Sequence, residues 1–369
     1  MQIGFDAKRA FNNTTGLGNY SRFVLDALHD FAPQNSYVAY TPRANFGVYN
    51  FPDVRQCQLP KILHSWWRTY AMAAQLRRDG IGLYHGLSNE LPVGLAKANI
   101  RSVVTIHDLI FLRYPELYPA IDRFFYRQKF KNACQQADAV VAVSAQTKRD
   151  IVAFYKIEPQ KIRVIYQNAH ALFRQPISPV CLSEVVLKYH LQKPYVVCVG
   201  TIEARKNQLR LVQAFAKANL PAESQLILIG AKTPFQTQIE DFIQKNKLSN
   251  RVQILNKVPF ADLPALYHNA RFFAYPSLFE GFGIPIVEAL HVGVAVLAAS
   301  GSCLEEAGGN GALYANPLEI DDLSEKITQL WHDDPLRQNL IQAGKQHVQR
   351  FAAEHIASQL TDLYRSVCP

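Results

Sequence analysis

The chain has 369 residues, well beyond the usual ~100 to 150 of a single domain, so we expect two domains. Apolar residues make up 49% of it, yet no apolar run approaches the ~18 residues of a membrane span, which argues against a spanning protein. The start, MQIGFDAKRAF, has no basic leader followed by an apolar stretch, and the six cysteines show no CxxC spacing. These features predict a cytoplasmic protein with reduced thiols and no structural zinc.

The net charge of +9 lies entirely in the first part of the chain. Residues 1–165 hold 21 Lys and Arg against 12 Asp and Glu, whereas residues 166–369 hold 18 of each. A basic face can attract nucleic acid, anionic lipid headgroups or a phosphorylated substrate, or it can simply be solvated. Because no recognition motif accompanies the charge, we do not expect a nucleic-acid partner.

Apolar runs typical of strands alternate with helical patterns along the chain. MQIGFDA, SVVTIHDL and DAVVAVS each precede a helical stretch, the longest of them around residues 118–137. The pattern restarts after KIRVIYQNA with YVVCVG, QLILIGA, VQILNKV, RFFAYPS and VAVLAAS. Repeated strand and helix units predict an α/β protein with two Rossmann-like domains. Residues 168–192, with two prolines and weak periodicity, are the expected linker.

Two glycines, Gly16 and Gly18, stand between the first predicted strand and an amphipathic helix. Glycines let backbone N–H groups approach a ligand, and the start of a helix favours an anion. Position 21 is Ser21, so the G-x-G-x-x-G fingerprint of a nicotinamide-binding enzyme is incomplete. An ordinary loop between strand and helix is the alternative.

The strand SVVTIHDL ends in His107, and the strand YVVCVG is followed by Arg205 and Lys206. Ligands of open α/β sheets bind at the carboxyl ends of strands. A histidine there can contact a hydroxyl or move a proton, although a packed histidine is equally compatible. Two adjacent cations suit a diphosphate, although they can also be an ordinary surface pair. Asn207 is the expected cap of the next helix.

The stretch SLFEGFGIPIVEAL places Glu280 and Glu288 on either side of a glycine turn that opens a helix near Ile284. Glu288, expected in about the first turn, can be explained by the helix dipole alone. Glu280 lies in the loop, where that explanation fails. A carboxylate accepts hydrogen bonds from hydroxyls, so the arrangement suits a ligand with an anionic centre and hydroxyls on either side, such as a nucleotide diphosphate sugar.

These residues resemble retaining glycosyltransferases of family four, and in particular mannosyl- and hexosyltransferases of bacterial polysaccharide assembly. The resemblance runs through TGLGNYSR, TIHDLIFLRYPE, VGTIEARKN, DLPALYHNA, SLFEGFGIPIVEAL and EEAGGNGALYANP. It implies the GT-B fold, in which two Rossmann-like domains face one another across a cleft. The N-terminal, acceptor-side domain would cover residues 1–172 and the nucleotide-sugar-binding domain residues 190–350. A C-terminal helix at about residues 352–369 would cross back to the first domain.

The resemblance also implies roles for five side chains. Glu280 would hold hydroxyls of the donor sugar, and Glu288 would hold the ribose hydroxyls. Arg205 and Lys206 would neutralise the diphosphate as it leaves, and His107 would contact the donor sugar from the N-terminal domain.

Backbone groups in the glycine turns would complete the donor site. Amides of Gly281, Phe282 and Gly283 would lie near the sugar and diphosphate. Gly16 and Gly18 would let their loop approach the phosphates and the acceptor.

The implied reaction is transfer of a hexose, with mannose the leading candidate, from a GDP- or UDP-linked donor to a glycan or lipid-linked acceptor. Relatives are thought to retain the anomeric configuration by a same-face route, in which the leaving diphosphate helps deprotonate the acceptor. No two aspartates stand two positions apart, so the D-x-D metal motif is absent and we expect no metal or other cofactor. Alternatives are an inactive nucleotide-sugar- or carbohydrate-binding protein of the same fold and, on the strand and helix pattern alone, a nicotinamide-dependent oxidoreductase.

The basic first half suggests a further partner. Residues 61–78, KILHSWWRTYAMAAQLRR, mix two tryptophans with cations, as peripheral membrane segments do. Trp66 and Trp67 can equally be core residues. We therefore expect the anionic inner face of the membrane as a contact surface, with core packing of the tryptophans as the alternative.

Overall fold

A computed structural model describes residues 1–191 and 194–368, and these form two compact units. The first unit combines Met1–Asn168 with Phe351–Pro369, and the second is Ala169–Arg350. Gln192, at the end of the expected linker and inside the expected second domain, and Pro369, at the end of the expected last helix, lie outside the described residues.

The first unit is built on a parallel sheet. Within its described residues the sheet has seven strands in the order β3-β2-β1-β4-β5-β6-β7. The strands are β1 (Gln2–Asp6), β2 (Ser36–Thr41), β3 (Val54–Gln56), β4 (Leu83–Gly86), β5 (Arg101–Ile106), β6 (Ala139–Ala142) and β7 (Ile162–Val164). The central strands are buried along their length, because helices cover both faces of such a sheet. Because β1 and β4 are parallel neighbours, their carboxyl ends lie at the same edge of the sheet.

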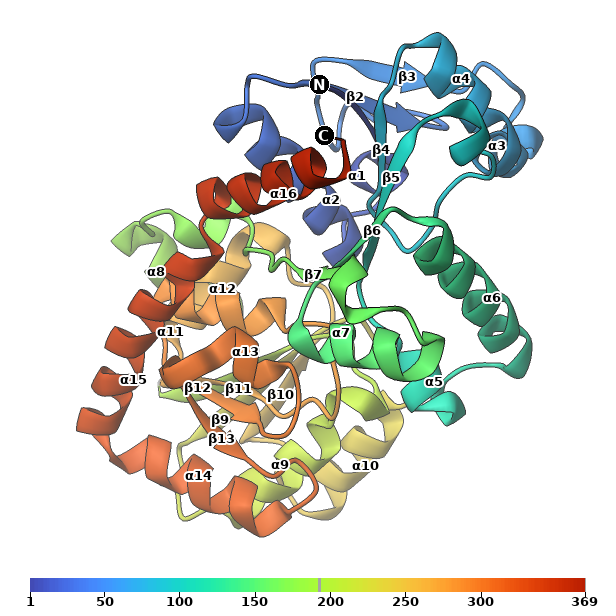
Figure 1. Ribbon diagram of the computed structural model, residues 1–369. Helices are drawn as coiled ribbons and strands as arrows, with labels where there is room; N and C mark the ends of the chain where they lie inside the picture. The colour runs from blue at the N-terminus through green and yellow to red at the C-terminus, as the bar shows by residue number, and fades with distance from the viewer. Residues whose placement is uncertain (192–193, 369) are drawn as a thin grey trace. The chain divides into compact units, whose positions relative to one another are not determined.

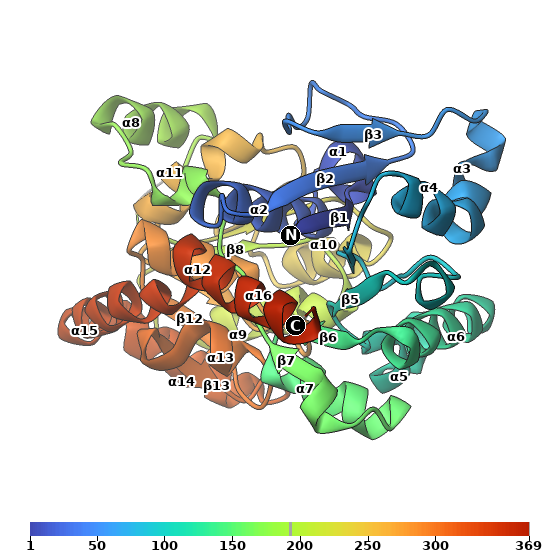
Figure 2. The ribbon, with the colours of Figure 1, turned by 45° about the horizontal axis from the view of Figure 1, so that its top comes forward.

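Eight α-helices surround this sheet among the described residues. They are α1 (Lys8–Asn12), α2 (Gly16–Phe31), α3 (His64–Trp66), α4 (Met72–Arg78), α5 (Ile110–Arg113), α6 (Ala120–Gln136), α7 (Ala145–Asp150) and α16 (Ala353–Val367). Helix α16, which follows the whole second unit in the chain, packs on α2 and β5 (Figures 1 and 2). Its Tyr364 hydroxyl lies 2.7 Å from Nδ1 of His85 in the buried core. The last helix thus returns to the first unit, as expected from the resemblance.

The second unit has its own parallel sheet. Within the described residues its six strands follow the order β10-β9-β8-β11-β12-β13. They are β8 (Tyr195–Val199), β9 (Gln225–Ile229), β10 (Val252–Leu255), β11 (Phe272–Tyr275), β12 (Val296–Ala299) and β13 (Ala312–Ala315). Five of these are the strands predicted from apolar runs, and they confirm the α/β class. Adjacent β8 and β11 bring segments about 75 residues apart to one sheet edge.

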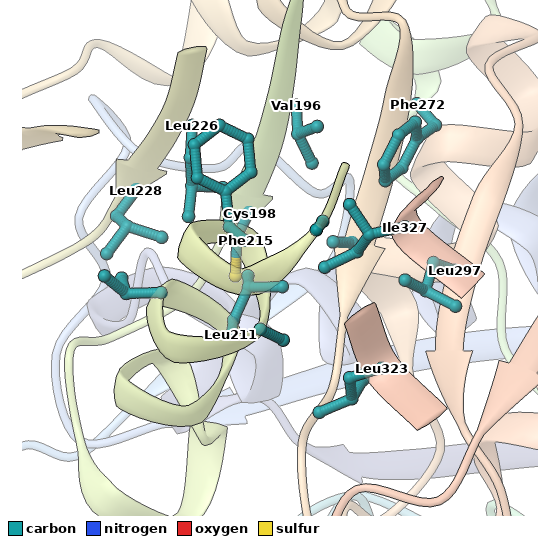
Figure 3. Packing of buried hydrophobic residues seen from close by; sticks show 14 of the residues in the cluster. Val196, Cys198, Leu211, Phe215, Leu226, Leu228, Phe272, Leu297, Leu323 and Ile327 are labelled. Carbon is teal, nitrogen blue, oxygen red and sulfur yellow. The ribbon is translucent and has the colours of Figure 1, made fainter. Parts of the chain in front are cut away.

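Among the described residues, eight α-helices accompany this second sheet. They are α8 (Pro179–Lys188), α9 (Gln208–Lys217), α10 (Gln236–Lys245), α11 (Leu263–Asn269), α12 (Ile284–Val292), α13 (Leu304–Gly308), α14 (Ile320–His332) and α15 (Asp334–His347). Figure 3 shows Leu211 and Phe215 of α9 among strand residues such as Val196 and Leu226, with all four fully buried. Burial of each such side chain stabilises the folded state by roughly 1.5 to 3 kcal/mol.

Part of the expected linker is helical. Ser178 and Pro179 begin α8, and the Ser178 hydroxyl accepts a hydrogen bond from the Cys181 amide at 3.2 Å. This Ser-Pro pair is a helix-start signal that weak periodicity concealed. The helix packs on α11 and belongs to the second unit.

Candidate active site

The loop between β11 and α12 holds the first of the two glutamates. β11 is a fully buried apolar strand, and α12 begins at Ile284, as predicted, with a proline in its first turn. Gly283 precedes the helix with φ of +118°, and a Cβ there would lie 2.8 Å from Leu304 Cδ2. Because this turn requires glycine, it holds Glu280 in the loop at the carboxyl end of the strand.

One oxygen of Glu280 is the hub of a buried polar cluster. Its Oε1 accepts from Lys206 Nζ at 2.5 Å, Ser277 Oγ at 2.6 Å and Tyr275 OH at 3.1 Å, and it pairs with Arg205 Nη1 at 2.9 Å. Burial alone would raise the pKa of the carboxyl, but the Lys206 and Arg205 charges outweigh it and lower the pKa to about 2. Oε2 has no partner among the described residues. An ionised carboxylate is therefore held with one oxygen saturated and the other able to accept hydrogen bonds.

Arg205 and Lys206 come from a short helical turn, η8 (Ala204–Lys206), that follows β8. Besides Glu280, Arg205 contacts the Phe279 carbonyl at 2.6 Å and Glu203 Oε1 at 2.6 Å. The two cations expected to bind diphosphate are thus balanced by two carboxylates. An incoming anion must therefore compete with these carboxylates for Arg205 and Lys206, or bind to N–H groups of the two cations that do not donate to a carboxylate.

Asn207 joins η8 to the loop after β11. It has φ of +62°, and its side-chain amide donates to the carbonyls of Pro276 at 3.1 Å and Pro317 at 2.7 Å. It is the N-cap residue of α9, as predicted, but its side chain makes no capping hydrogen bond. The amide instead connects segments that are distant in sequence and fixes the place of Arg205 and Lys206.

Glu288 has a different environment. We had expected Glu288 in about the first turn of α12, but it is the fifth residue of the helix and lies just beyond that turn. Its side chain is only 6% exposed. Tyr267 OH donates to its Oε2 at 3.1 Å. Burial raises the pKa of Glu288 to about 7, and the Tyr267 hydrogen bond offsets only part of this. No hydrogen bond or ion pair within the described residues joins Glu288 to Glu280, so the two glutamates are separate sites of the same unit.

In the turn formed by residues 281–283, between the two glutamates, mainly backbone groups are available to contact a ligand. The Phe282 side chain is buried, with 2% of it exposed, so it packs inside the unit. Gly281 and Gly283 have no side chain to offer. Amide contacts remain the role expected for these three residues.

His107 follows β5 in the first unit. Its Nε2 lies 2.9 Å from the Leu87 carbonyl, which can only accept, so the proton resides on Nε2. Burial lowers the pKa of His107 to about 4, which leaves the ring neutral at pH 7. Nδ1 then carries a lone pair. A hydroxyl could donate to it, whereas proton donation from this ring would disrupt the Leu87 contact.

Gly16 and Gly18 lie inside α2, as its first and third residues, and do not precede it as predicted. A Cβ at Gly18 would lie 1.8 Å from the Asn13 carbonyl oxygen, so close packing within the unit already requires this glycine. The Asn13 side chain also accepts from the Gly18 amide at 3.2 Å. A Cβ at Gly16 would meet nothing, which leaves its surroundings open.

Sequence reasoning missed three members of the Glu280 cluster: Glu203, Tyr275 and Ser277. Glu203 was visible beside the cations, and the other two close the strand RFFAYPS. The available signal was their position at strand ends. Among the described residues, no group of three His, Cys, Asp or Glu side chains is placed to hold a metal ion.

Comparisons with known proteins agree along the chain. Residues 186–347 match the family described as glycosyl transferases group 1, and residues 26–167 match glycosyltransferase family 4. O-antigen chain mannosyltransferase B of Escherichia coli is 32% identical over 311 residues, covering 83% of this chain and 78% of that protein. O-antigen chain mannosyltransferase RfbU of Salmonella typhimurium is 25% identical over 82% of this chain and 83% of that protein.

Solved structures match the whole chain at low sequence identity. Sucrose-phosphate synthase from Thermosynechococcus elongatus has a TM-score of 0.77 and 22% identity, covering 99% of this chain and 98% of that one. Anabaena HepE in complex with UDP-glucose has a TM-score of 0.76 and 20% identity, covering 99% and 100%. These likenesses establish the two-domain GT-B fold predicted from the sequence.

Proposed function

The chain belongs to glycosyltransferase family 4, and on that premise we propose that it transfers a hexose from a nucleotide diphosphate sugar to a glycan or lipid-linked acceptor, with retention of configuration. Mannose is the leading candidate because the similar O-antigen enzymes are named mannosyltransferases. Such an enzyme would work in the cytoplasm, at the inner face of the membrane.

The single observation that carries this proposal is the state of Glu280. Four donors converge on Oε1, and the carboxyl is ionised at any physiological pH because its pKa is about 2. Oε2 is left to accept from hydroxyls, and sugars are rich in hydroxyl donors.

Lys206 supports binding of the diphosphate beside the sugar. Its ammonium has three N–H donors, of which two are directed to Tyr275 and Glu280. The third is available to a phosphate oxygen. Charge that develops on the departing diphosphate would be stabilised here without any rearrangement of Lys206.

The proposed reaction is a same-face substitution. The bond from the anomeric carbon to the diphosphate oxygen breaks, and the acceptor oxygen bonds to the same face of that carbon. The acceptor proton passes to the departing diphosphate, so no side chain has to act as a base. The enzyme contributes orientation and charge stabilisation, with Arg205 and Lys206 acting in place of a metal.

Membrane contact is a second part of the proposal. The turn η1 (Lys61–Leu63) precedes α3, and the π-helical turn η2 (Trp67–Ala71) joins α3 to α4, so residues 61–78 form one continuous helical stretch. Ile62 and Trp66, four residues apart, are both largely exposed, whereas Trp67 is only 4% exposed. Residues four apart share a helix face, and an apolar face beside cations suits an anionic lipid surface. Among the described residues, no helix is both long and apolar enough to cross a bilayer.

The decisive experiment combines binding with turnover. Thermal shifts with GDP, UDP, ADP and dTDP identify the nucleotide, because a ligand at 100 times its dissociation constant stabilises by about 2.7 kcal/mol. Transfer to soluble mannosides is then measured with the matching nucleotide sugars. We expect Lys206→Ala to reduce turnover about 100-fold, and Lys217→Ala, which removes an exposed ion pair with Asp321, to leave it unchanged.

Two results would contradict the proposal. Undiminished turnover by Lys206→Ala would remove the assigned role of this cation. Nucleotide binding without transfer to any acceptor or water would favour the inactive binding protein.

A further inference from the structure

The first unit contains a cavity of about 480 Å³ that the donor-site residues do not explain. It lies at the carboxyl ends of the neighbouring strands β1 and β4, with Asp6 as the last residue of β1 and Tyr84 within β4. This is the edge at which open α/β sheets bind ligands. The volume falls within the ~300 to 1,000 Å³ typical of small-molecule sites.

A glycine brings the second acidic residue of the cavity into place. The chain folds back after β4 so closely that a Cβ on Gly86 would lie 2.1 Å from the backbone oxygen of Glu90. Only glycine permits this approach. Glu90 consequently stands over the strand end beside Asp6, on the cavity wall.

The charges of the cavity are balanced internally. Arg68 Nη2 lies 2.6 Å from Asp6 and 3.3 Å from Glu90, and Lys129 Nζ lies 2.7 Å from Glu90. Both cations on the wall therefore already face carboxylates, so a phosphate would enter against two negative charges. The carboxylates keep lone pairs and Arg68 keeps N–H groups, which together can serve hydroxyls as donors and as acceptors.

Aromatic side chains form another part of the wall. Tyr70 and Phe125 are more than half exposed, and Tyr126 is held against Phe130 with ring centroids 5.8 Å apart. Exposed aromatic rings beside a polar cluster suit a ligand with one apolar face and a polar rim. A pyranose has this form, because its C–H groups share a face and its hydroxyls lie around the ring.

We propose that this cavity binds the terminal, uncharged sugar of the acceptor glycan, with its ring against Phe125 and its hydroxyls on Asp6 and Glu90. The inference rests on the proposed function and specifies its acceptor class, which is a neutral glycan end and not a sugar phosphate. Phe125 and Glu90 are then residues that determine acceptor affinity without contacting the donor.

The test is steady-state kinetics of the full chain with soluble methyl glycosides, which keeps membrane contact out of the measurement. Phe125→Ala should raise the acceptor KM about tenfold and leave the donor KM unchanged. Phe124→Ala is the control, since Phe124 is 61% exposed against 62% for Phe125, on the same helix, and does not line the cavity. The Phe124 and Phe125 rings contact each other edge to face, so Phe124→Ala also controls for loss of this ring contact.

The possible outcomes separate this inference from the function beneath it. An unchanged acceptor KM in Phe125→Ala, or an equal rise of the donor KM, would overturn the cavity assignment while transfer itself stands. Preference for mannose 6-phosphate over methyl mannoside as a competitor would overturn the neutral acceptor class. If no donor supports transfer, binding of methyl mannoside is measured directly by saturation-transfer NMR. Loss of the methyl mannoside signal in Phe125→Ala, but not in Phe124→Ala, would support the cavity assignment. Persistence of the signal in Phe125→Ala would refute it.

Discussion

Lys206 Nζ lies 2.5 Å from Oε1 of Glu280, so the cation assigned to the diphosphate and the carboxylate assigned to the sugar form one ion pair. Both side chains are largely buried, and their segments meet because β8 and β11 are neighbours in the sheet. Under the proposed roles, sugar and diphosphate recognition would be coupled through this ion pair, and a change in either partner should affect both.

Glu280→Gln should reduce transfer about 100-fold or more, because a neutral amide cannot hold four donors, leaves the buried Lys206 without its carboxylate and leaves Arg205 with Glu203 alone. The check is kcat with saturating donor, together with the melting temperature to confirm folding. Glu203→Gln is the control, since among the described residues the Glu203 carboxylate forms an ion pair with Arg205 alone and is more exposed than that of Glu280. Near-normal transfer by Glu280→Gln would remove the main support for the donor site.

Transfer should be independent of divalent metal. We assign the charge stabilisation to Arg205 and Lys206, so turnover in excess EDTA should equal that in buffer with added Mg²⁺ or Mn²⁺. The measurement is initial rate after extensive dialysis. A strict requirement for either ion would contradict the proposed mechanism.

The buried carboxyl of Glu288 should make stability depend on pH. Its pKa is raised to about 7 in the folded protein, so the stability it contributes is full below the unfolded pKa of 4.5 and is lost as pH rises through 7. Relative to wild type, Glu288→Gln should gain about 2 kcal/mol between pH 5.5 and pH 8. Urea unfolding at both pH values measures this, and a constant difference would show that Glu288 titrates normally.

The same substitution should weaken nucleotide binding. Glu288 is assigned to the ribose hydroxyls, and a neutral amide is a poorer acceptor than a carboxylate. We expect the dissociation constant of the preferred nucleoside diphosphate to rise about tenfold at pH 8, measured by calorimetry. Glu305→Gln, on α13, provides a control of the same chemistry. Equal affinities of wild type and Glu288→Gln would exclude the ribose assignment.

Membrane binding should depend on the exposed face of residues 61–78. The double variant Ile62→Ser, Trp66→Ser should lose most co-sedimentation with phosphatidylglycerol vesicles, and binding of the wild type should weaken as salt rises. Leu318→Ser removes a comparably exposed apolar side chain from the second unit and should have no effect. A wild-type protein that stays in the supernatant would refute the contact.

Local patterns predicted the elements well where one physical signal dominated. Buried parallel strands such as β11 and β12 are continuous apolar runs, and the start of α12 was readable from Pro285. The resemblance added the fold and the return of α16. Signals failed where a side chain had competing uses, as with Asn207, whose amide bridges two carbonyls in place of capping.

What the sequence could not predict depends on strand order. Ser277 and Tyr275 stand about 70 residues from Lys206, and only the pairing of β8 with β11 brings them onto one glutamate. Trp66 and Trp67 were indistinguishable as neighbours until the helix direction placed one outside and one inside. The acceptor cavity is likewise gathered from distant segments by the pairing of β1 with β4.

The contact between His85 and Tyr364 bears on how the protein is made. The His85 ring lies between the Tyr364 hydroxyl and Thr105 Oγ1, at 2.7 and 2.9 Å, so a residue of the last helix shares one buried network with residues of the amino-terminal part of the chain. On the ribosome, the contiguous second unit can be completed while the first still lacks α16. Domains usually finish in their order of synthesis. Here the amino-terminal domain must wait, with its α2 surface uncovered, until translation has passed the entire carboxyl-terminal one.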